Sequence, residues 1–288
     1  MLKKRIAANI VVRNGIVVQS IGFSKYLPVG KPNIAIEFLN QWGIDEIILL
    51  DISATRNSRG PNFQMIKAGA KKCFVPLTVG GGVNNIDQIA ELMHCGADKI
   101  SLNRAILTNP SFVTEAAKVF GNQCIIASID VLNTEAGYRV YDYVNQKALN
   151  VKPAVFAAQV EALGVGEILL NSVDKDGFYS GFDIELIDEV CSALTIPLTC
   201  QGGAKNAIDF INVLDRTAAS CASAANFFHF TEHSVNITKA IVNKEIPIRL
   251  ESFADYSDNK FDQDLRLQKK SDKELEEMLF EKITKEII

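Results

Sequence analysis

Val79-Gly80-Gly81-Gly82-Val83 follows the apolar run Phe74-Val75-Pro76-Leu77-Thr78 and precedes a helical pattern that begins after Asn84. Glycines between a strand and a helix let the backbone approach a ligand closely and leave the first N–H groups of the helix free for an anion. A second copy, Cys200-Gln201-Gly202-Gly203-Ala204, follows another short apolar run. The alternative interpretation is two unrelated glycine turns.

The two glycine stretches belong to a longer internal repeat with an offset of 121 residues. The matched positions are Gly43 with Gly164, Gly81 with Gly202, Gly82 with Gly203, and Glu46-Ile47-Ile48-Leu49-Leu50 with Glu167-Ile168-Leu169-Leu170-Asn171. Such matches in one register indicate two similar halves.

Strand-like and helix-like patterns alternate along residues 1–251. The expected strands are residues 6–12, 46–51, 74–79, 99–102, 125–130, 167–171, 197–201 and 218–224, with a polar loop at 24–32 and a hairpin-like excursion at 133–150. Eight such units over about 250 residues predict an α/β fold, a (β/α)8 TIM barrel with a twofold half-barrel repeat. A doubly wound parallel sheet is the alternative.

The composition excludes several classes of protein. Lys plus Arg total 30 and Asp plus Glu total 34, which gives a net charge of −4 and argues against a broad surface for nucleic acid or anionic membrane. No uncharged apolar run reaches the length of a membrane span, and the six scattered cysteines suit reduced thiols in a cytoplasmic protein without a zinc site. We expect no metal and no cofactor.

Residues 252–288 differ from the rest of the chain in composition. Residues 255–270 are charged and predict a linker, and Ser271-Asp272-Lys273-Glu274 matches a capping box. Leu275, Met278, Leu279 and Ile283 recur at helical spacing, so we expect a C-terminal amphipathic helix that packs on the barrel or meets a partner.

Polar residues and glycines cluster at the ends of the expected strands, where the active sites of such barrels form. Two anion sites would suit a substrate with two phosphates, one held by each half. The first site would combine Gly82, Ser101, Asn103 and Arg104; the second would combine Gly177, Gly202, Gly203, Ala225 and Asn226, with Asp176 nearby. The competing interpretation is glycines that serve only tight turns.

Asp130 and Asp51 end otherwise apolar strands, where a carboxylate is costly unless it is used or paired. We expect Asp130 to transfer protons and Asp51 to orient the substrate. For Asp51, a carboxylate bonded to loop amides is the alternative. The histidines offer no catalytic pattern; His94, His229 and His233 suit surface or capping roles.

Four charged residues stand where expected strands begin: Arg5, Glu46, Lys99 and Glu167. Two cations and two anions at the same end of a barrel would form a closed ring of salt bridges. Physical reasoning favours a stabilising role, because this end of the barrel usually contributes stability.

These residues and others resemble the HisF family, the cyclase subunits of imidazole glycerol phosphate synthase, over residues 1 to about 250. The matching motifs are Arg5-Ile6, Gly43-Ile44-Asp45-Glu46, Leu50-Asp51-Ile52, Val79-Gly80-Gly81-Gly82, Gly96-Ala97-Asp98-Lys99, Ile129-Asp130, Gly166-Glu167-Ile168-Leu169-Leu170, Asp174-Lys175-Asp176-Gly177 and Phe228-His229-Phe230. The resemblance implies a phosphorylated small-molecule substrate and a HisH-like glutaminase partner whose ammonia passes through the barrel. It also implies that the ring is an ammonia gate, that Asp98 docks the partner and that Asp130 is catalytic.

Two positions depart from the family pattern. Val11 stands where the family has a catalytic Asp in the first strand, and Gln19 replaces a phosphate-contacting Lys. Val11 and Arg59-Gly60-Pro61-Asn62-Phe63 look more like a divergent HisF-like branch. That branch works with a HisH-like glutaminase and a sugar amidotransferase on lipopolysaccharide and other surface-polysaccharide sugars.

Two functions therefore follow as hypotheses. In the first, the chain is a cyclase that builds a C–N bond on a phosphorylated substrate, with Asp130 as the acid–base residue. In the second, it is a scaffold and ammonia conduit, and another protein performs the chemistry.

Overall fold

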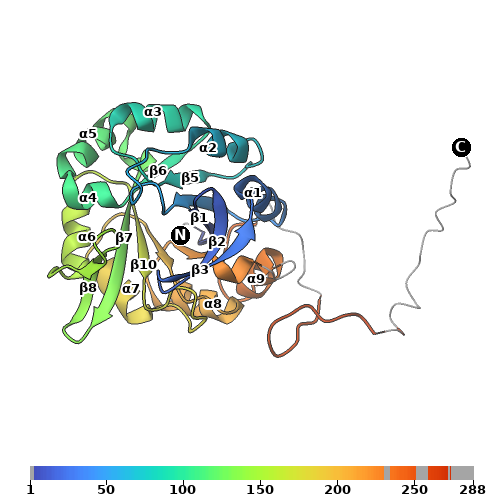
Figure 1. The fold of residues 1–288 in the computed structure, drawn as a ribbon. Helices are drawn as coiled ribbons and strands as arrows, with labels where there is room; N and C mark the ends of the chain where they lie inside the picture. The colour runs from blue at the N-terminus through green and yellow to red at the C-terminus, as the bar shows by residue number, and fades with distance from the viewer. Residues whose placement is uncertain (1–2, 230–233, 251–258, 272, 274–288) are drawn as a thin grey trace, which may run out of the picture.

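Eight parallel strands form a closed ring in the computed structural model, which describes residues 3–229, 234–250, 259–271 and 273 (Figure 1). The ring contains β1 (Arg5–Arg13), β4 (Glu46–Asp51), β5 (Leu77–Gly80), β6 (Lys99–Leu102), β7 (Ile125–Thr134), β10 (Glu167–Ser172), β11 (Leu198–Gln201) and β12 (Cys221–Ala224). The strands run in the order β10-β11-β12-β1-β4-β5-β6-β7, and pairing of β7 with β10 closes the ring. The predicted (β/α)8 barrel is confirmed, and the doubly wound sheet is excluded.

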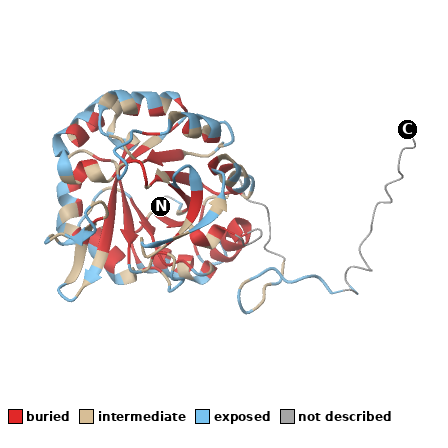
Figure 2. Ribbon diagram, viewed as in Figure 1, coloured by how far each residue is buried: buried red, intermediate tan, exposed pale blue. Residues whose placement is uncertain are grey.

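Helices surround this ring and pack on its outer side (Figures 1 and 2). They are α1 (Pro32–Gln41), α2 (Phe63–Ala70), α3 (Ile86–His94), α4 (Arg104–Thr108), α5 (Pro110–Phe120), α6 (Pro153–Glu161), α7 (Ile184–Cys191), α8 (Ala207–Arg216) and α9 (Ser234–Val242), with short 3-10 turns η1 (Asn122–Cys124) and η2 (Asn226–Phe228). Local sequence sets their starts: Asn85 accepts from the Gln88 N–H before α3, and Asn206 forms a capping box with Asp209 before α8.

The half-barrel repeat is visible in the strand boundaries. The offset of 121 residues carries β4 onto β10 and β5 onto β11 without adjustment. It also relates glycines with positive φ, such as Gly82 at 75° and Gly203 at 100°. The predicted similarity of the two halves is therefore a property of the fold.

Two apolar clusters lie on either side of the strand ring. The larger one fills the space between strands and helices. The smaller one lies inside the barrel and consists of Ala7, Ile48, Ile126, Leu169 and Cys221, with Leu50 packed against it. We call this inner cluster the apolar layer. The carboxyl ends of the strands form the mouth above it, and their amino ends form the floor below it.

The polar loop predicted at residues 24–32 is wrong, because most of this segment is a strand of a β-hairpin. β2 (Ile16–Ile21) pairs antiparallel with the end of β1, and β3 (Lys25–Gly30) pairs with β2. Asn14 and Gly15 connect β1 to β2 with φ of 52° and 81°. Asn-Gly between two apolar runs is the usual signal for this tight turn, so the sequence did contain the information.

The excursion at residues 133–150 is a hairpin, as expected. β7 continues past the barrel to Thr134 and pairs with β8 (Gly137–Asp142), which pairs in turn with β9 (Lys147–Ala148). We call residues 133–150 the arm. It carries Asp142 and Tyr143 to the mouth of the barrel.

Four strand starts differ from the expected ones, those of β1 and β11 by one residue and those of β5 and β12 by three. β5 begins at Leu77 rather than residue 74, because Pro76 has no N–H for a strand ladder and Phe74 points to solvent with 84% exposure. β12 begins at Cys221 rather than residue 218.

The C-terminal segment is described only in part. Arg249 donates its N–H to the Lys4 carbonyl at the floor, and Lys244 lies over the ring of Phe261 at 5.7 Å. The expected helix from Leu275 to Ile283 lies outside the described residues, as does His233. Among the described residues, no helix has both the length and the apolar character needed to cross a bilayer.

Candidate functional site

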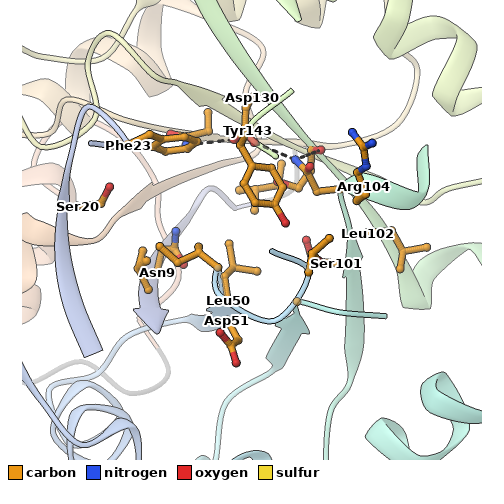
Figure 3. A pocket seen from close by; sticks show the side chains of 18 of the residues that line it. Asn9, Ser20, Phe23, Leu50, Asp51, Ser101, Leu102, Arg104, Asp130 and Tyr143 are labelled. Carbon is orange, nitrogen blue, oxygen red and sulfur yellow. Dashed lines mark hydrogen bonds between the residues drawn. The ribbon is translucent and has the colours of Figure 1, made fainter. Parts of the chain in front are cut away.

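A cavity opens at the mouth of the barrel and connects the two halves. This central cavity is lined by Asp51, Gly82 and Ser101 of the first half and by Asp130, Asp176 and Gln201 of the second. Figure 3 shows Asp51, Ser101 and Asp130 around it. A further pocket adjoins it on each side. One shares Gly82 and Arg104 with the central cavity, and the other shares Asp176 and Gln201. The predicted glycines of both halves therefore reach one common mouth.

The pocket on the side of the first half, which we call site 1, is cationic. Arg59 and Arg104 line it together with Gly82 and Asn84. The Arg104 guanidinium donates to Asp142 of the arm at 2.5 Å, which fixes its position. Ser101 and Asn103, which the sequence grouped with Gly82, line the central cavity instead.

Asp142 is built to hold Arg104 in place. Burial opposes its ionisation, but hydrogen bonds from Asn145 and Arg104 lower the pKa of Asp142. Asp142 is 4% exposed and also accepts from the backbone N–H groups of Val144 and Asn145. A planar guanidinium held by a buried carboxylate beside a cavity suits recognition of phosphate or carboxylate.

The pocket on the side of the second half, site 2, contains the predicted glycines, and among the described residues no Lys or Arg lines it. Its walls are Gly177, Gly202, Gly203, Ala225 and Asn226, with Asp176 beside them.

Polar side chains at site 2 form hydrogen bonds within the protein. The Asn226 amide donates to the Ser20 carbonyl at 2.7 Å and accepts from the Ser20 N–H at 3.2 Å. Gln19 lies here as well and reaches the Asn226 carbonyl at 3.5 Å. Gln19 thus brings an uncharged amide to site 2, whereas Arg59 and Arg104 line site 1.

Packing alone requires glycine at the central positions of both sites. A Cβ on Gly82 would lie 2.5 Å from the Arg59 carbonyl oxygen, and one on Gly203 would lie 2.1 Å from that of Gly181. Both residues also have positive φ. Contacts with neighbouring loops are therefore enough to explain why these residues are glycines. The argument that site 1 binds an anion rests instead on Arg59 and Arg104.

Asp130 is the most perturbed carboxyl group at the mouth. It ends the barrel part of β7, is 6% exposed, and accepts from Asn103 Nδ2 at 2.9 Å and Asn171 Nδ2 at 3.3 Å. Burial raises the pKa of Asp130 to about 7, against the effect of these two hydrogen bonds, and the charge of Asp176 adds to the rise. A carboxyl group with this pKa can both give and take a proton near neutral pH.

The stability of the fold should depend on this ionisation. In the unfolded chain Asp130 loses its proton near pH 3.8, and in the folded chain near pH 7. Stability is therefore complete below pH 3.8 and falls as the pH rises through 7, by about 4 kcal/mol in total. We expect Asp130→Asn to match wild type in urea unfolding near pH 4 and to be more stable near pH 8. Equal stability at both pH values would contradict the assignment.

The strand pairing shows what stands opposite Asp130. Asp130 pairs with Asn171 in β10, and Val11 pairs with Leu50 in β4. Leu50 and Asn171 are equivalent in the two halves, so Val11 and Asp130 occupy equivalent positions. Val11 is 6% exposed and lines the central cavity. The cavity thus has a carboxyl group on one side and an apolar side chain on the other.

Two further carboxyl groups that line the central cavity are held by serines. Asp51 Oδ1 accepts from the Ser53 N–H at 2.9 Å and from its hydroxyl at 2.6 Å, which is the loop-bonded arrangement named as the alternative. Ser20 donates to Asp176 at 2.6 Å, and burial raises the pKa of Asp176 to about 6.

The predicted ring of salt bridges is present at the floor. Arg5 contacts Glu46 and lies 3.2 Å from Glu167, while Lys99 lies 2.8 Å from Glu167 and 3.7 Å from Glu46. Thr199 adds a hydrogen bond to Glu167 at 2.6 Å. Burial opposes ionisation of Glu167, but Lys99 and Arg5 lower its pKa. The ring closes the barrel directly below the apolar layer.

Several residues at the mouth were missed in the sequence. Phe23 from the β2–β3 turn and Tyr143 from the arm line the central cavity with Arg56. Arg56 donates to the Tyr143 carbonyl at 2.6 Å and lies 5.5 Å from its ring centre. The sequence predicts the arm, but only the folded chain shows that Tyr143 reaches the mouth.

The remaining candidate groups lie away from this chemistry. His94 ends α3, and His229 is buried rather than at the surface; burial lowers its pKa to about 4, so it is neutral. The six cysteines are free. Within the described part of the chain, no three His, Cys, Asp or Glu side chains gather closely enough to hold a metal ion.

Fold and site together define a class: a (β/α)8 barrel of two similar halves, with a charged floor and one polar cavity at the mouth. A family model described as a histidine biosynthesis protein matches residues 5–234. The chain belongs to this family, and its similarity is to the HisF proteins in it.

Three relatives illustrate the similarity. A protein of Vibrio vulnificus (strain YJ016), provisionally named imidazole glycerol phosphate synthase subunit hisF2, is 40% identical over 257 residues, which cover 89% of this chain and 94% of the relative. Imidazole glycerol phosphate synthase subunit HisF of Clostridium botulinum (strain Kyoto / Type A2) is 38% identical over 85% of this chain and 98% of its own length. The HisF subunit of Dehalococcoides mccartyi (strain ATCC BAA-2266 / KCTC 15142 / 195) is 37% identical over 88% of this chain and all of its own.

Proposed function

We propose that this chain is the cyclase subunit of an imidazole glycerol phosphate synthase, which forms a C–N bond from ammonia on a phosphorylated substrate. The observation that carries the proposal is Asp130, a buried carboxyl group with a pKa of about 7 inside a cavity that also reaches the cations of site 1. The names of the relatives support the reaction.

Asp130 is the acid–base residue in this proposal. It is held by Asn103 and Asn171, so the carboxyl group keeps one orientation while it exchanges a proton with the reacting nitrogen. Val11 supplies no second proton-transfer group, so Asp130 performs both transfers or shares them with the substrate's own groups. Asp51 positions the substrate through the loop that Ser53 stabilises.

Ammonia enters from the floor. The ring of Arg5, Glu46, Lys99 and Glu167 controls the entrance, and the apolar layer lies above it. An ammonium ion would have to shed its hydration to cross buried apolar side chains, whereas neutral ammonia crosses at much lower cost. This order of layers supports transport of the neutral molecule toward Asp130.

The source of ammonia is a HisH-like glutaminase docked on the floor. Asp98 is exposed there, next to Lys99 of the ring, and its Oδ2 accepts from the Leu77 N–H at 2.8 Å. We expect Asp98→Ala to weaken assembly with the glutaminase about tenfold, measured by calorimetry. Asp98→Asn keeps an acceptor for Leu77 but loses the charge, so it separates docking from folding. Unchanged affinity in both variants would contradict the docking role.

Site 1 holds a phosphate of the substrate through Arg104. A charged, oriented guanidinium is worth about 1.5–3 kcal/mol to an anion, so Arg104→Met should raise KM at least tenfold with little change in kcat. Asp142→Asn should raise KM less, since it loosens Arg104 without removing it. Lys118→Met on α5 serves as the control for loss of one positive charge. Equal KM values in all three variants would contradict a phosphate at site 1.

The alternative role with a sugar amidotransferase is not supported by the names of the relatives. The experiment that tests the proposed function is direct: purified chain, ammonium salt and the bisphosphate precursor of the histidine pathway, with imidazole glycerol phosphate as the measured product. Product formation above the rate without protein supports the proposal. Its absence with ammonium salt and with a glutaminase partner and glutamine would overturn it.

A further inference from the structure

Four polar side chains line one side of the barrel interior just above the apolar layer. Asn171 of β10 pairs with Gln201 of β11, which pairs with Ser223 of β12. Asn9 of β1, the next strand in the ring, completes the set by donating to Gln201 Oε1 at 2.7 Å. We call Asn9, Asn171, Gln201 and Ser223 the polar arc.

Three oxygen atoms of the polar arc are buried without a hydrogen-bond partner. They are Asn9 Oδ1, Asn171 Oδ1 and Ser223 Oγ, in residues that are 1%, 5% and 0% exposed. Buried polar atoms are nearly always satisfied in folded proteins, so three in one place call for an explanation. Asn9 and Asn171 line the central cavity, which gives a small ligand access to the arc. Figure 3 shows Asn9 at this cavity.

The arc lies between the two ends of the proposed ammonia path. Alternate residues of β1 face the interior, so Arg5 belongs to the ring, Ala7 to the apolar layer, Asn9 to the arc and Val11 to the mouth. At the upper end, Asn171 Nδ2 donates to Asp130 Oδ1 at 3.3 Å. A molecule held by the arc has passed the apolar layer and lies beside the acid–base residue.

The chemistry of the arc fits ammonia. The unpartnered amide oxygens are acceptors, and the Ser223 hydroxyl can accept or donate. Ammonia offers three N–H donors and one lone pair in a molecule the size of water. A phosphate or carboxylate would be repelled by the same oxygens. We propose that the polar arc is a binding site for one ammonia molecule, which holds it beside Asp130 until the substrate is in place.

This proposal rests on the proposed function for its ligand, but its test does not require product formation. The protein is labelled with ¹⁵N-asparagine, and the side-chain amide signals of Asn9 and Asn171 are followed by NMR during titration with ammonium chloride at alkaline pH. Potassium chloride at equal concentration is the control for ionic strength. We expect saturable shifts of both signals with ammonium only.

Two variants make the result specific. Asn9→Leu/Gln201→Met replaces the hydrogen-bonded pair by apolar side chains of similar size and should weaken binding about tenfold, read from the Asn171 signal. Ser223→Ala removes one oxygen, should also weaken binding, and provides the test if the double variant does not fold. Asn33→Leu on α1, outside the strand ring, should bind like wild type.

The outcomes separate this proposal from the proposed function. Absent shifts, equal shifts with potassium, or undiminished binding in the folded variants would overturn the ammonia site, even if the chain makes product. Specific binding without product formation would leave the site standing and remove the synthase assignment.

Discussion

We expect Asp130→Asn to lower kcat of ammonium-dependent synthesis by about 10²–10⁴-fold, because it removes a positioned acid–base group while keeping the size of the side chain. Asn103 and Asn171 hold Asp130 by hydrogen bonds, and asparagine can still accept one of them, so KM should change little. Steady-state kinetics with saturating ammonium salt measure the effect. This loss of rate accompanies the gain in stability expected near pH 8.

Two controls sharpen this experiment. Asp215→Asn, in the exposed last turn of α8, removes a carboxylate away from the mouth and should leave kcat unchanged. Val11→Asp places a second carboxyl group at the position equivalent to Asp130 in the other half. If wild type is slow, Val11→Asp should raise its rate. Activity retained by Asp130→Asn would remove Asp130 from the mechanism, whatever Val11→Asp does.

The second large effect concerns the floor. Glu167 is 6% exposed, forms ion pairs with Arg5 and Lys99, and accepts a hydrogen bond from the Thr199 hydroxyl. Glu167→Ala leaves two cations without this partner, and breaking a buried ion pair costs about 3–5 kcal/mol. We expect the free energy of unfolding, from urea titration at pH 7, to fall by that amount. Because the pKa of Glu167 is lowered in the fold, the loss should shrink as the pH falls through it.

An exposed ion pair elsewhere provides the control for this loss. Lys72 and Glu37 lie 3.0 Å apart with side chains 48% and 38% exposed, so Glu37→Ala should cost no more than about 1 kcal/mol. In the complex with glutaminase, Glu167→Ala should also release ammonia to solution and lower product formed per glutamine. If Glu167→Ala unfolds at the same urea concentration as wild type and forms as much product per glutamine, the ring neither stabilises the barrel nor controls the entry of ammonia.

The fold was predictable because its signals are local and periodic. The strands that begin with Glu46 and Glu167 are short, apolar and followed by polar residues or glycine, and the repeat relates them directly. The charged ring was also predictable, since parallel strands in a barrel bring their first residues to one end. The side chains at both rims could therefore be assigned from strand boundaries alone.

What the sequence did not show depends on contacts between distant segments. Arg104 was recognised as a candidate cation, but its partner Asp142 lies in the arm, and only the folded hairpin brings the two together. Gln19 lies at site 2 because the turn at Asn14-Gly15 folds β2 back along β1, and this turn was not predicted. The polar arc could not be predicted without the register of the paired strands, because Asn9 and Gln201 are far apart in the chain.

The repeat has a consequence for the ancestry of this barrel. Duplication and fusion of one four-stranded ancestor would leave two halves with the same chemistry, each able to supply a carboxyl group to the shared rim. In this chain the later half carries Asp130, while the earlier half carries Val11 in the matching place. A hybrid barrel assembled from two copies of the later half would therefore carry a carboxyl group at both positions.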